Sequence, residues 1–402
     1  MFHLTQFIKD KVTGRQTSMF ADDIAANSQR LTHEISGRKV LVIGGAGTIG
    51  SSFIRAILPF RPAALVVVDI NENGLTELTR DLRSTPGGYV PDEYVTYPMN
   101  FNDAVFEKMF RAHGGFDIVA NFSAHKHVRS EKDVYSVEAL LENNVLRARK
   151  LLTLLEEFPP RHYFCVSTDK AANPVNIMGG SKKIMEDMIM AYSHKFPVTT
   201  ARFANVAFSN GSLPDGWMQR IARRQPLSAP NDVTRYFVSP DESGEICMLA
   251  CMLGQSGEIY FPKLGKEQVK TFSAIASDLL TAMGYTPVEC RSEQEAITMA
   301  ARLTDTDREY PVYYSGSNTT GEKPYEEFFT DSETIDMTRH QALGVVTGVQ
   351  PRPMGEIDAL FETLTAAFDK PDTTKAEIVA IMKGFLRNFE HEEKGLYLDS
   401  KM

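Results

Sequence analysis

Cysteine is scarce in this sequence. The 402 residues include 4 cysteines, Cys165, Cys247, Cys251 and Cys290. That number is too small for a disulfide framework, and the spacing contains no pair of CxxC motifs that would hold a structural zinc ion. We therefore expect reduced thiols in a cytoplasmic protein, and we expect no metal site.

Long apolar runs and an excess of positive charge are also absent. The longest apolar stretch, residues 246–253, is less than half of the roughly 20 residues that a membrane-spanning helix requires. The first residues show no continuous apolar segment followed by a small-residue cleavage site, so we expect neither a secretory signal nor a membrane anchor. The formal net charge is -9, and without a basic block the chain is not expected to bind nucleic acid.

The sequence does contain a regular alternation of short β-branched runs and amphipathic stretches, which starts at residue 39. This alternation is typical of βαβ units and predicts an α/β fold with a doubly wound parallel sheet. Strands buried on both faces are expected at residues 39–43, 64–68, 94–98, 117–121, 163–166 and 199–203. Helices are expected between them, near residues 48–58, 73–83, 103–112, 133–157 and 178–195.

After residue 205 the pattern becomes irregular and rich in turns. A further strand is expected at residues 258–261, and helices are expected near 270–283 and 355–368. This part of the sequence predicts a smaller, mixed lobe that covers the C-terminal edge of the sheet.

The segment GGAGTIG, residues 44–50, directly follows the first expected strand and precedes a helix. Glycines in this position let the backbone turn sharply, approach a pyrophosphate closely and pack the helix on the strand. Asp69 ends the second strand, and its carboxylate suits a ribose with both hydroxyls free while repelling a 2′-phosphate. The motif therefore predicts an NAD(P)-binding Rossmann unit, with NAD favoured over NADP.

Two polar residues, Asn100 and Asp103, follow the third expected strand, where a sheet of this kind flanks an adenine. They can equally be turn and helix-cap residues, so both interpretations stay open. Together with the glycine loop, the expected cofactor-binding residues are Gly44, Gly47, Thr48, Ile49, Gly50, Asp69 and Asn100.

Thr168, Asp169 and Lys170 follow the fifth expected strand. A hydroxyl, a carboxylate and an amine at the C-terminal edge of the sheet, where ligands bind in open α/β folds, form a candidate catalytic set. The alternative is a solvated Asp–Lys pair on the surface. Met178 and Lys182 stand four residues apart and therefore share one face of the following helix. Because the Met178 side chain cannot transfer a proton, acid–base chemistry must come from the other groups.

A series of strings occurs in order between about residues 38 and 330: GGAGTIG, SAHKHV, STDKAANPVNIMGGSKK, ARFANV, DVTRYF and GEKPYEE. In these strings the sequence resembles the nucleotide-sugar 4,6-dehydratases of polysaccharide biosynthesis, notably the C5-inverting UDP-N-acetylglucosamine 4,6-dehydratases, which are extended short-chain dehydrogenases/reductases. In most short-chain dehydrogenases a tyrosine occupies the position of Met178, and some members of this family have methionine there. The sequence departs from the family pattern at Ile43, where threonine is usual, and at residues 318–320, where part of a basic turn is replaced.

The resemblance implies roles for the catalytic stretch. A tightly held nicotinamide cofactor would accept hydride from sugar C4, and the resulting ketone would acidify the C5 proton. Lys170, kept neutral by cationic surroundings, would remove that proton, and Asp169 would protonate the departing C6 hydroxyl. Thr168 would assist proton removal from the C4 hydroxyl in place of tyrosine, and Lys182 would contact the ribose and the nicotinamide.

The resemblance also implies contacts with a substrate. Asn144 would lie near the catalytic helix, and Lys323 at the margin of the active site. Arg235, Glu322 and Lys323 can also be plain surface charges. Asn205 and Arg235 resemble positions that contact the diphosphate and the nucleotide, since a guanidinium suits phosphate oxygens. Lys126 would lie near the substrate and the cofactor, and Glu322 at the margin of the active site. The expected substrate-binding residues are therefore Lys126, Asn205, Arg235 and Glu322.

These patterns divide the chain into four expected segments. We expect a helical N-terminal arm over residues 1–37, an NAD(P)-binding Rossmann domain over 38–206, a substrate-binding lobe over 207–370 whose strand at 257–261 returns to the sheet, and a helical C-terminal arm over 371–402. The resemblance predicts a nucleotide-sugar substrate and a homo-oligomer. A nucleotide-sugar epimerase or reductase is the enzymatic alternative. The absence of the usual tyrosine leaves a catalytically silent, NAD(P)-sensing protein as the alternative of another class.

Overall fold

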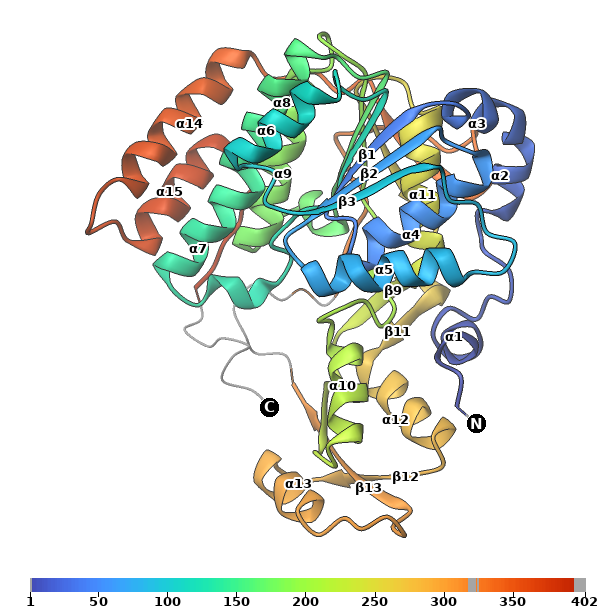
Figure 1. Ribbon diagram of the computed structural model, residues 1–402. Helices are drawn as coiled ribbons and strands as arrows, with labels where there is room; N and C mark the ends of the chain where they lie inside the picture. Colours follow the sequence, from blue (N-terminus) through green and yellow to red (C-terminus); the bar gives the residue numbers. More distant parts are fainter. Residues whose placement is uncertain (1, 317–322, 324, 394–402) are drawn as a thin grey trace.

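The computed structural model describes residues 2–316, 323 and 325–393 (Figure 1). Its main feature is a nine-stranded sheet with the strand order β14-β15-β10-β6-β5-β4-β1-β2-β3. From β3 to β10 in that order neighbouring strands are parallel, whereas β15 is antiparallel to β10, and β14 to β15. The predicted α/β fold with a doubly wound parallel sheet is confirmed. The strands are β1 (Lys39–Ile43), β2 (Ala64–Asp69), β3 (Glu93–Pro98), β4 (Ile118–Asn121), β5 (His162–Val166), β6 (Val198–Ala201), β10 (Glu258–Pro262), β14 (Thr334–Asp336) and β15 (Leu343–Thr347).

Burial of the strands follows their place in the sheet. The central strands β1, β4, β5 and β6 consist mainly of buried residues, as expected for a sheet covered on both faces. The expectation is wrong for β3, whose residues are all exposed or half-buried. This strand lies at the edge of the sheet and has a neighbour on one side only.

Helices cover both faces of the sheet (Figure 1). One side carries α4 (Thr48–Ile57), α5 (Glu72–Ser84) and α11 (Pro240–Leu253), and the other carries α6 (Ala104–Ala112), α8 (Arg147–Glu157) and α9 (Ile177–Ala191). The helix expected at residues 133–157 is divided, because a π-helical turn at Glu142–Leu146 separates α7 (Val134–Leu141) from α8. The sheet with these helices is called the sheet unit below.

The sequence pattern does not predict α11. Its residues are buried almost all round the helix, so the segment lacks the polar stripe that marks an amphipathic helix. A capping box formed by Ser239 and Glu242 begins the helix. At Gly244 it approaches α4 so closely that an added Cβ would lie 2.2 Å from the carbonyl carbon of Ser52. A helix in this position forms an inner wall of the sheet unit.

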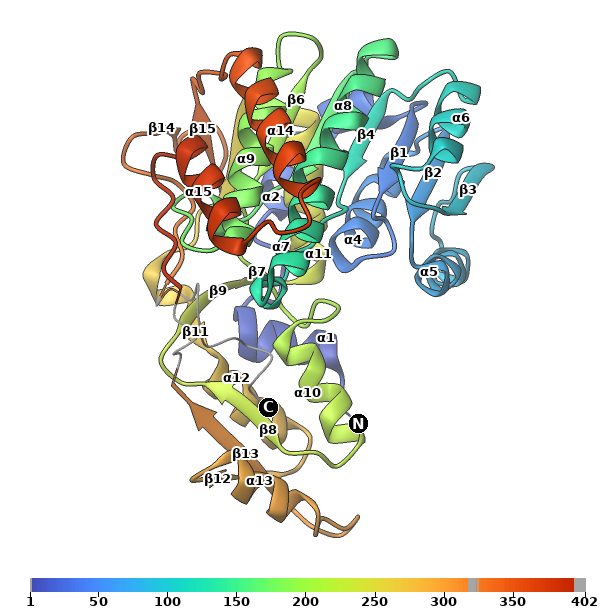
Figure 2. The ribbon, with the colours of Figure 1, turned by 90° about the vertical axis from the view of Figure 1, so that its left-hand side faces the viewer.

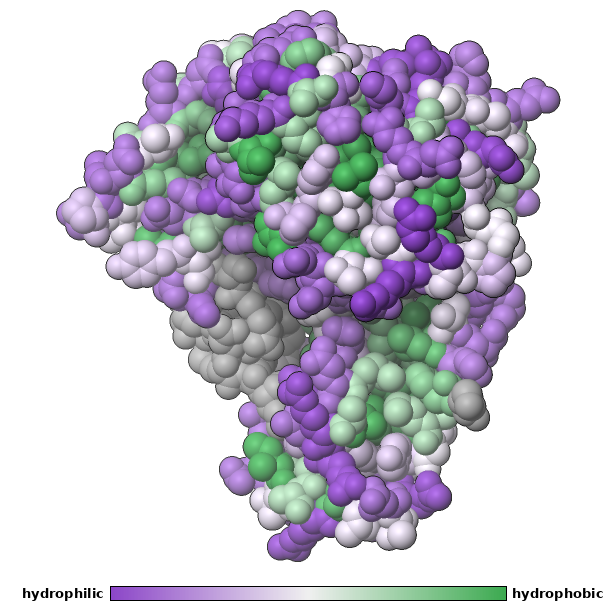
Figure 3. Space-filling view, in the orientation of Figure 1, coloured by the Kyte–Doolittle hydropathy of each residue, from purple (hydrophilic) through white to green (hydrophobic). Residues whose placement is uncertain are grey.

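A smaller lobe lies below the sheet unit in Figures 1 and 2. The molecular outline is broader over the sheet unit than over the lobe (Figure 3). The lobe contains two three-stranded sheets, β11-β9-β7 and β12-β13-β8. The helix predicted near residues 270–283 is confirmed as α12. The elements are β7 (Asn205–Val206), β8 (Leu227–Pro230), β9 (Thr234–Val238), β11 (Val269–Thr271), β12 (Thr286–Cys290), β13 (Glu309–Ser315), α10 (Leu213–Ala222), α12 (Phe272–Ala282) and α13 (Glu293–Ala300).

The N-terminal residues contact both units. α1 (Leu4–Phe7) and the π-helical turn after it place apolar side chains in the core of the lobe. α2 (Ala21–Ala26) and α3 (Ser28–Ile35) pack instead against the core of the sheet unit. Between them, Arg15 forms an ion pair of 2.7 Å with Glu242 at the start of α11. The segment therefore bridges the sheet unit and the lobe.

Two C-terminal helices, α14 (Met354–Phe368) and α15 (Lys375–Phe385), lie beside α7 and α9 (Figure 2). Their apolar side chains form a cluster of their own with those of α7 and α9, which includes Met178 and Met382. The helix predicted near residues 355–368 is confirmed as α14.

The division of the chain into four segments stays a prediction. The structure nevertheless places more of residues 207–370 in the sheet unit than expected, because α11, β14, β15 and α14 lie there besides the returning strand β10. In the described part of the chain, no helix has both the length and the apolar character that crossing a membrane requires.

Candidate functional site

The glycine loop turns tightly between β1 and α4. Gly44 has φ +75°, and a Cβ there would lie 2.7 Å from the backbone nitrogen of Ser123. A Cβ at Gly50 would lie 2.3 Å from the carbonyl oxygen of Gly44, so both positions require glycine. A Cβ at Gly47 would lie 3.5 Å from its nearest neighbour, the carbonyl oxygen of Gly44, which is an ordinary van der Waals contact. This residue is the N-cap of α4, whose free backbone N–H groups suit a pyrophosphate. The loop therefore fits a dinucleotide.

The carboxylate of Asp69 also belongs to this cradle. Its Oδ2 accepts a hydrogen bond of 3.0 Å from the backbone nitrogen of Ala46, within the glycine loop. Its Oδ1 accepts a second hydrogen bond, of 2.9 Å, from the nitrogen of Asn71. A carboxylate has further lone pairs, so these contacts orient Asp69 and leave it able to accept from a ribose hydroxyl.

The polar pair after β3 forms a local turn. The Asn100 side chain accepts from the nitrogen of Asn102 at 3.0 Å, and Asp103 accepts from the nitrogen of Asn100 at 3.3 Å. These bonds agree with the turn and helix-cap interpretation. A contact of Asn100 with an adenine stays a prediction.

The catalytic stretch begins where β5 ends. Asp169 is buried, and its Oδ1 accepts three hydrogen bonds: 2.8 Å from Thr168 Oγ1, 2.9 Å from the Lys170 backbone nitrogen and 2.9 Å from Lys170 Nζ. These donors include a charged ammonium, so the bond between Asp169 and Lys170 is a charge-assisted hydrogen bond. The solvated surface pair that was the alternative for Asp169 and Lys170 is not what the structure contains.

A second carboxylate and a guanidinium complete this charge cluster. Glu326 Oε1 lies 3.9 Å from Lys170 Nζ and 3.9 Å from Arg235 Nη2. Both Glu326 and Arg235 are buried, and Arg235 Nη1 also donates 3.0 Å to the carbonyl oxygen of Lys323. Burial raises the pKa of Glu326, against the opposing effect of Lys170.

The charge environment corrects the expected state of Lys170. Burial alone would lower its pKa, but the nearby charges of Asp169 and Glu326 prevail and raise the pKa above its ordinary value, with Arg235 acting in the opposite direction. The expectation of cationic surroundings that keep the amine neutral is therefore wrong. The amine rests as an ammonium held between two carboxylates.

The helix α9 places Lys182 and Met178 differently. Lys182 Nζ donates 3.0 Å to the carbonyl oxygen of Val166, the last residue of β5, so its amine lies at the sheet edge as predicted. Burial lowers its pKa. The Met178 side chain instead belongs to the apolar cluster of α7, α9, α14 and α15. Asn144 bonds to α9 through Ser181 Oγ at 3.0 Å, near the catalytic helix as expected.

A cavity of about 540 Å³ lies between the end of the sheet and the lobe. Four residues predicted from the sequence line it: Lys126, Lys170, Asn205 and Arg235. Thr168, Asp169, Met178 and Lys182 are not among its lining residues, although Asp169 is bonded to Lys170, and Thr168 to Asp169. Glu322 and residues 318–320 lie outside the described residues.

Lys126 and Asn205 are two polar residues of the cavity wall. Lys126 Nζ donates 2.7 Å to the carbonyl oxygen of Asn210, and Thr48 of the glycine loop accepts 2.9 Å from the nitrogen of the same residue. Asn205 Nδ2 is buried and has no hydrogen-bond partner among the residues that the structure describes. A buried donor without a partner on the wall of a cavity indicates a place for a ligand acceptor.

Sequence reasoning missed Glu326, Asp215 and Arg220, which also line the cavity. Glu326 stands in the quoted string GEKPYEE, but nothing in that string distinguishes the buried glutamate from the exposed Glu327 beside it. Asp215 and Arg220 belong to α10, a helix without a recognised motif, so no sequence signal marked them.

A family model described as "Polysaccharide biosynthesis protein" matches residues 40–347. The uncharacterized membrane protein MJ1061 of Methanocaldococcus jannaschii is 26% identical over 325 residues, which are 79% of this chain and 88% of that protein. The capsular polysaccharide biosynthesis protein CapD of Staphylococcus aureus is 27% identical over 61% of this chain, and the match covers 41% of its length. The chain thus spans less than half of CapD. An inverting UDP-N-acetylglucosamine 4,6-dehydratase of Campylobacter jejuni is 24% identical, over 61% of this chain and 72% of that enzyme.

Solved structures share the fold. Pen from Bacillus thuringiensis has a TM-score of 0.62 at 19% identity, over 79% of this chain and 91% of that chain. The dTDP-glucose 4,6-dehydratase DesIV from Streptomyces venezuelae, a double mutant with NAD and DAU bound, has a TM-score of 0.52 at 20% identity, over 73% of this chain and 93% of that chain.

Proposed function

The chain belongs to the polysaccharide biosynthesis protein family, and from this premise we propose that it is an NAD-dependent nucleotide-sugar 4,6-dehydratase. The proposed substrate is UDP-N-acetylglucosamine or a related nucleotide-activated hexosamine. One observation carries the proposal: the Lys170 amine, paired with the buried Asp169 carboxylate, opens into a cavity that Asn205 and Arg235 also line. The Lys170 amine and a phosphate-binding guanidinium thereby face one ligand, and the acid, Asp169, is hydrogen-bonded to that amine.

The cofactor has its own support. Gly44, Gly47 and Gly50 fit a dinucleotide pyrophosphate, and the carboxylate of Asp69 favours the free ribose hydroxyls of NAD. When bound, the nicotinamide supplies the reversible hydride transfer that makes sugar C4 a ketone. Lys182, whose amine lies at the end of β5, would contact the ribose.

The Asp169–Lys170 ion pair suits an elimination of water. In the resting state Lys170 holds the proton and Asp169 is ionised, whereas the reaction needs a neutral amine and a protonated acid. Asp169 would take its proton from the C4 hydroxyl through Thr168 as C4 is oxidised, and Lys170 would release its proton to solvent. A sugar that displaces water from the cavity favours the neutral form, because desolvation destabilises both charges.

From the neutral form, the elimination balances. The C5–H bond breaks and its proton goes to Lys170 Nζ, while the C6–O bond breaks and the oxygen takes the Asp169 proton to leave as water. Each residue then has its resting charge. Return of the hydride to C6 and of the Lys170 proton to C5 would give the 4-keto-6-deoxy sugar and leave the amine neutral again. Thr168 Oγ1, 2.8 Å from Asp169 Oδ1, connects the C4 hydroxyl proton to the same carboxylate.

The test is to incubate the purified full chain and NAD with UDP-N-acetylglucosamine in D₂O. We expect a 4-keto-6-deoxy product by NMR, with solvent deuterium at C5. Lys170→Ala and Asp169→Asn should reduce turnover at least roughly a hundredfold, as for loss of a general acid or base. Lys195→Ala, on the surface, is the matched control. An absence of product with every UDP-, GDP- and dTDP-hexose or hexosamine would overturn the proposal.

The same experiment separates the alternatives. An epimerase or reductase would keep oxygen at C6, which the NMR spectrum of the product reports directly. A silent NAD(P)-sensing protein would bind cofactor in wild type and variants alike and would turn over no sugar. The buried acid–base pair at the cavity favours the dehydratase, since a sensor requires neither group.

A further inference from the structure

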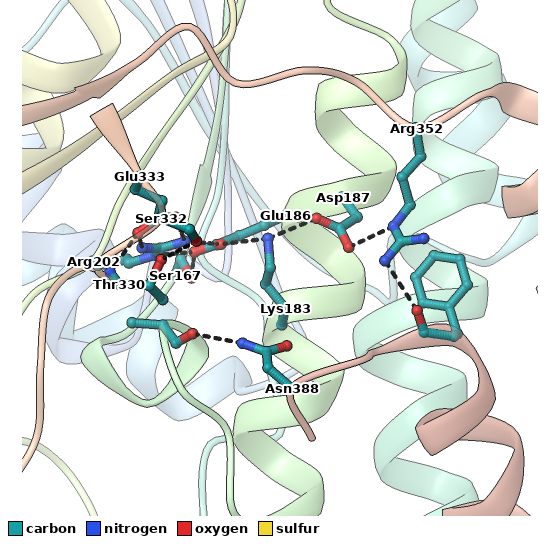
Figure 4. A network of polar contacts seen from close by, with 12 residues as sticks. Ser167, Lys183, Glu186, Asp187, Arg202, Thr330, Ser332, Glu333, Arg352 and Asn388 are labelled. Atoms are coloured by element: carbon teal, nitrogen blue, oxygen red, sulfur yellow. Dashed lines mark hydrogen bonds and ion pairs between the residues drawn. The ribbon is translucent and has the colours of Figure 1, made fainter. Parts of the chain in front are cut away.

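The loop between Lys170 and α9 is held by residues near the C-terminus. Each of the four consecutive carbonyl groups of residues 172–175 accepts a hydrogen bond from a distant part of the chain. Three of the four donors belong to residues 386–391, which are called the C-terminal segment below. The donors are Asn388 Nδ2 to residue 172 at 3.2 Å (Figure 4), Lys323 Nζ to 173 at 2.5 Å, the Glu390 backbone nitrogen to 174 at 3.2 Å and His391 Nδ1 to 175 at 3.3 Å.

His391 is the buried side chain among these donors. Its ring stacks on that of Phe389, with 5.8 Å between the centroids. A carbonyl oxygen can only accept, so Nδ1 carries the hydrogen of the bond to Val175. Burial lowers the pKa of His391, so the ring is neutral at neutral pH. Nε2 lies 3.7 Å from Oε2 of Glu393, which is beyond hydrogen-bond distance. The bond to Val175 therefore sets the tautomer and the orientation of the ring.

The first turn of α9 lies between Lys170 and the C-terminal segment. A Cβ added to Gly179 would lie 2.5 Å from the carbonyl oxygen of Lys170. A Cβ added to Gly180 would lie 2.6 Å from Met382 Cε and 3.2 Å from Phe389 Cε2. One glycine thus admits the backbone of the catalytic lysine, and the next admits side chains from the C-terminal part of the chain. Any displacement of the C-terminal segment therefore reaches the backbone that carries Lys170.

The start of the C-terminal segment is fixed to α9 as well. Arg352 Nε donates 3.0 Å to Asp187 of α9, and its Nη2 donates 2.9 Å to the carbonyl oxygen of Phe385, the last residue of α15 (Figure 4). The guanidinium also lies over the Phe385 ring, 4.2 Å from its centroid. Leu386, the next residue, is buried in the apolar cluster of α7, α9, α14 and α15. The segment is therefore held at both ends.

The turn that carries the proposed acid and base joins this loop directly. Residues 169–171 form a 3-10 turn, and the nitrogen of Ala172 donates 3.2 Å to the carbonyl oxygen of Asp169. Ala172 is thus bonded to the turn through its nitrogen and to the C-terminal segment through its carbonyl group. Lys170 Nζ lies 2.9 Å from Asp169 and 3.9 Å from Glu326. Both distances depend on where this turn lies.

We propose that His391 is a positioning residue, which together with Asn388 holds the loop after Lys170 in place. In that place the amine stays between its two carboxylates and faces the cavity. The proposal rests on the proposed function and extends it to residues beyond the family match, which ends at residue 347. His391 is not among the described residues that line the cavity, so it acts through the loop. Its loss lowers kcat and changes KM little, because the groups that bind substrate stay in place.

The first readout is turnover of UDP-N-acetylglucosamine by the full chain with NAD. His391→Leu removes the donor, and Asn388→Asp replaces an exposed donor by an acceptor of the same shape. Both should lower kcat by up to about a hundredfold at little-changed KM, because small misplacements of catalytic groups cost that much. His391→Asn, whose amide places a donor near the position of Nδ1, should retain most of the turnover. Arg387→Ala, an exposed change in the same segment, is the matched control and should turn over as wild type does.

The second readout does not require turnover. Acetic anhydride acetylates neutral amines, and mass spectrometry of the digested chain gives the rate at Lys170, with the exposed Lys195 as the internal reference. A loosened loop exposes the amine and separates it from its carboxylates, so the Lys170 rate should rise severalfold in His391→Leu and Asn388→Asp. The Lys195 rate and the NADH affinity should not change. Thermal unfolding of Asn388→Asp should match wild type, because this side chain is exposed.

Together the readouts separate the two proposals. Equal Lys170 acetylation in wild type, His391→Leu and Asn388→Asp would overturn the positioning role and leave the dehydratase proposal to its own test. A wild-type kcat in both variants would overturn the positioning role as well. If wild type turns over no nucleotide sugar while the Lys170 rate still rises in the variants, the positioning role stands and the dehydratase proposal falls.

Discussion

The ammonium of Lys170 lies 2.9 Å from Oδ1 of Asp169, the residue before it in the chain. Glu326 lies on the other side of the same ammonium, at 3.9 Å. Both carboxylates stabilise the protonated amine, so the neutral amine that would attack a C5 proton is reached only as the pH rises. The pH dependence of turnover therefore reports on this cluster.

Glu326→Gln removes one of the two carboxylates. The pKa of Lys170 should fall. The rising limb of the pH profile, in which kcat increases with pH, should therefore move to lower pH. The pH–rate profile of C5 deuterium exchange measures this shift. Glu327→Gln is the control, because Glu327 is exposed and lies outside the cavity. An unchanged limb in Glu326→Gln would exclude Lys170 as the base that the profile reports.

Asp69→Asn tests the choice of cofactor. Asparagine keeps an acceptor for the Ala46 nitrogen but removes the negative charge that repels a 2′-phosphate. The preference for NAD over NADP should shrink roughly ten- to hundredfold, because like-charge juxtaposition costs several kcal/mol. Titrations of NADH and NADPH followed by fluorescence give both affinities. Asp92→Asn, which changes an exposed carboxylate, is the control and should leave the ratio of the NADH and NADPH affinities unchanged. If Asp69→Asn also leaves this ratio unchanged, Asp69 does not select the cofactor.

Arg202 should be critical for stability. It follows β6, is fully buried, and pairs with Glu186 of α9 at 2.7 Å and with Glu333 at 2.9 Å (Figure 4). Glu186 also accepts 2.6 Å from Ser167 Oγ, next to the catalytic stretch. Arg202→Met removes the buried guanidinium from both carboxylates, leaving Glu186 with the more distant Lys183 at 3.8 Å, and should cost about 3–5 kcal/mol in the free energy of unfolding.

Calorimetry or urea unfolding measures that loss. Lys195→Met breaks a surface pair with Glu156 and should cost less than about 1 kcal/mol. Adding Glu186→Gln to Arg202→Met should recover part of the stability, because one unpaired charge is removed. An Arg202→Met variant as stable as wild type would show that the network contributes little.

Glu131 should make stability depend on pH. It is buried, its Oε1 accepts 3.0 Å from the Met178 nitrogen at the start of α9, and burial raises its pKa from 4.5 to about 7. Glu393 adds to this rise, while the hydrogen bonds and Lys375 oppose it. Between pH 4.5 and 7 the folded chain holds a proton that the unfolded chain has released. The contribution of Glu131 to stability is therefore fully present below pH 4.5 and is lost as the pH rises through 7.

Glu131→Gln removes this dependence and keeps an acceptor for Met178. The difference in unfolding free energy between wild type and the variant should change by up to about 3 kcal/mol across that range, from the shift in pKa. Urea unfolding at several pH values measures it. Glu362→Gln, which changes an exposed side chain on α14, is the control, and its difference in unfolding free energy from wild type should not vary with pH. If the difference for Glu131→Gln also does not vary with pH, Glu131 is not held in the neutral form by burial.

Long, regular patterns made most of the sheet unit predictable. Buried strands such as β1 and β5 are mainly apolar runs, and the glycine loop between β1 and α4 is a short local motif, although Gly44 also lies against the distant Ser123. The pattern failed at α11, which is buried all round and so has no polar stripe, and at β3, whose position at the sheet edge depends on strand order.

The candidate site divides in the same way. Thr168, Asp169 and Lys170 are adjacent in the chain, so the sequence by itself determined that a hydroxyl, a carboxylate and an amine stand together at the end of β5. Only the tertiary structure decided that Glu326 lies between Lys170 and Arg235, and that Asp215 and Arg220 of α10 line the same cavity. Contacts between distant segments depend on how the lobe packs against the sheet, and that packing sums many weak apolar contacts that no short motif records.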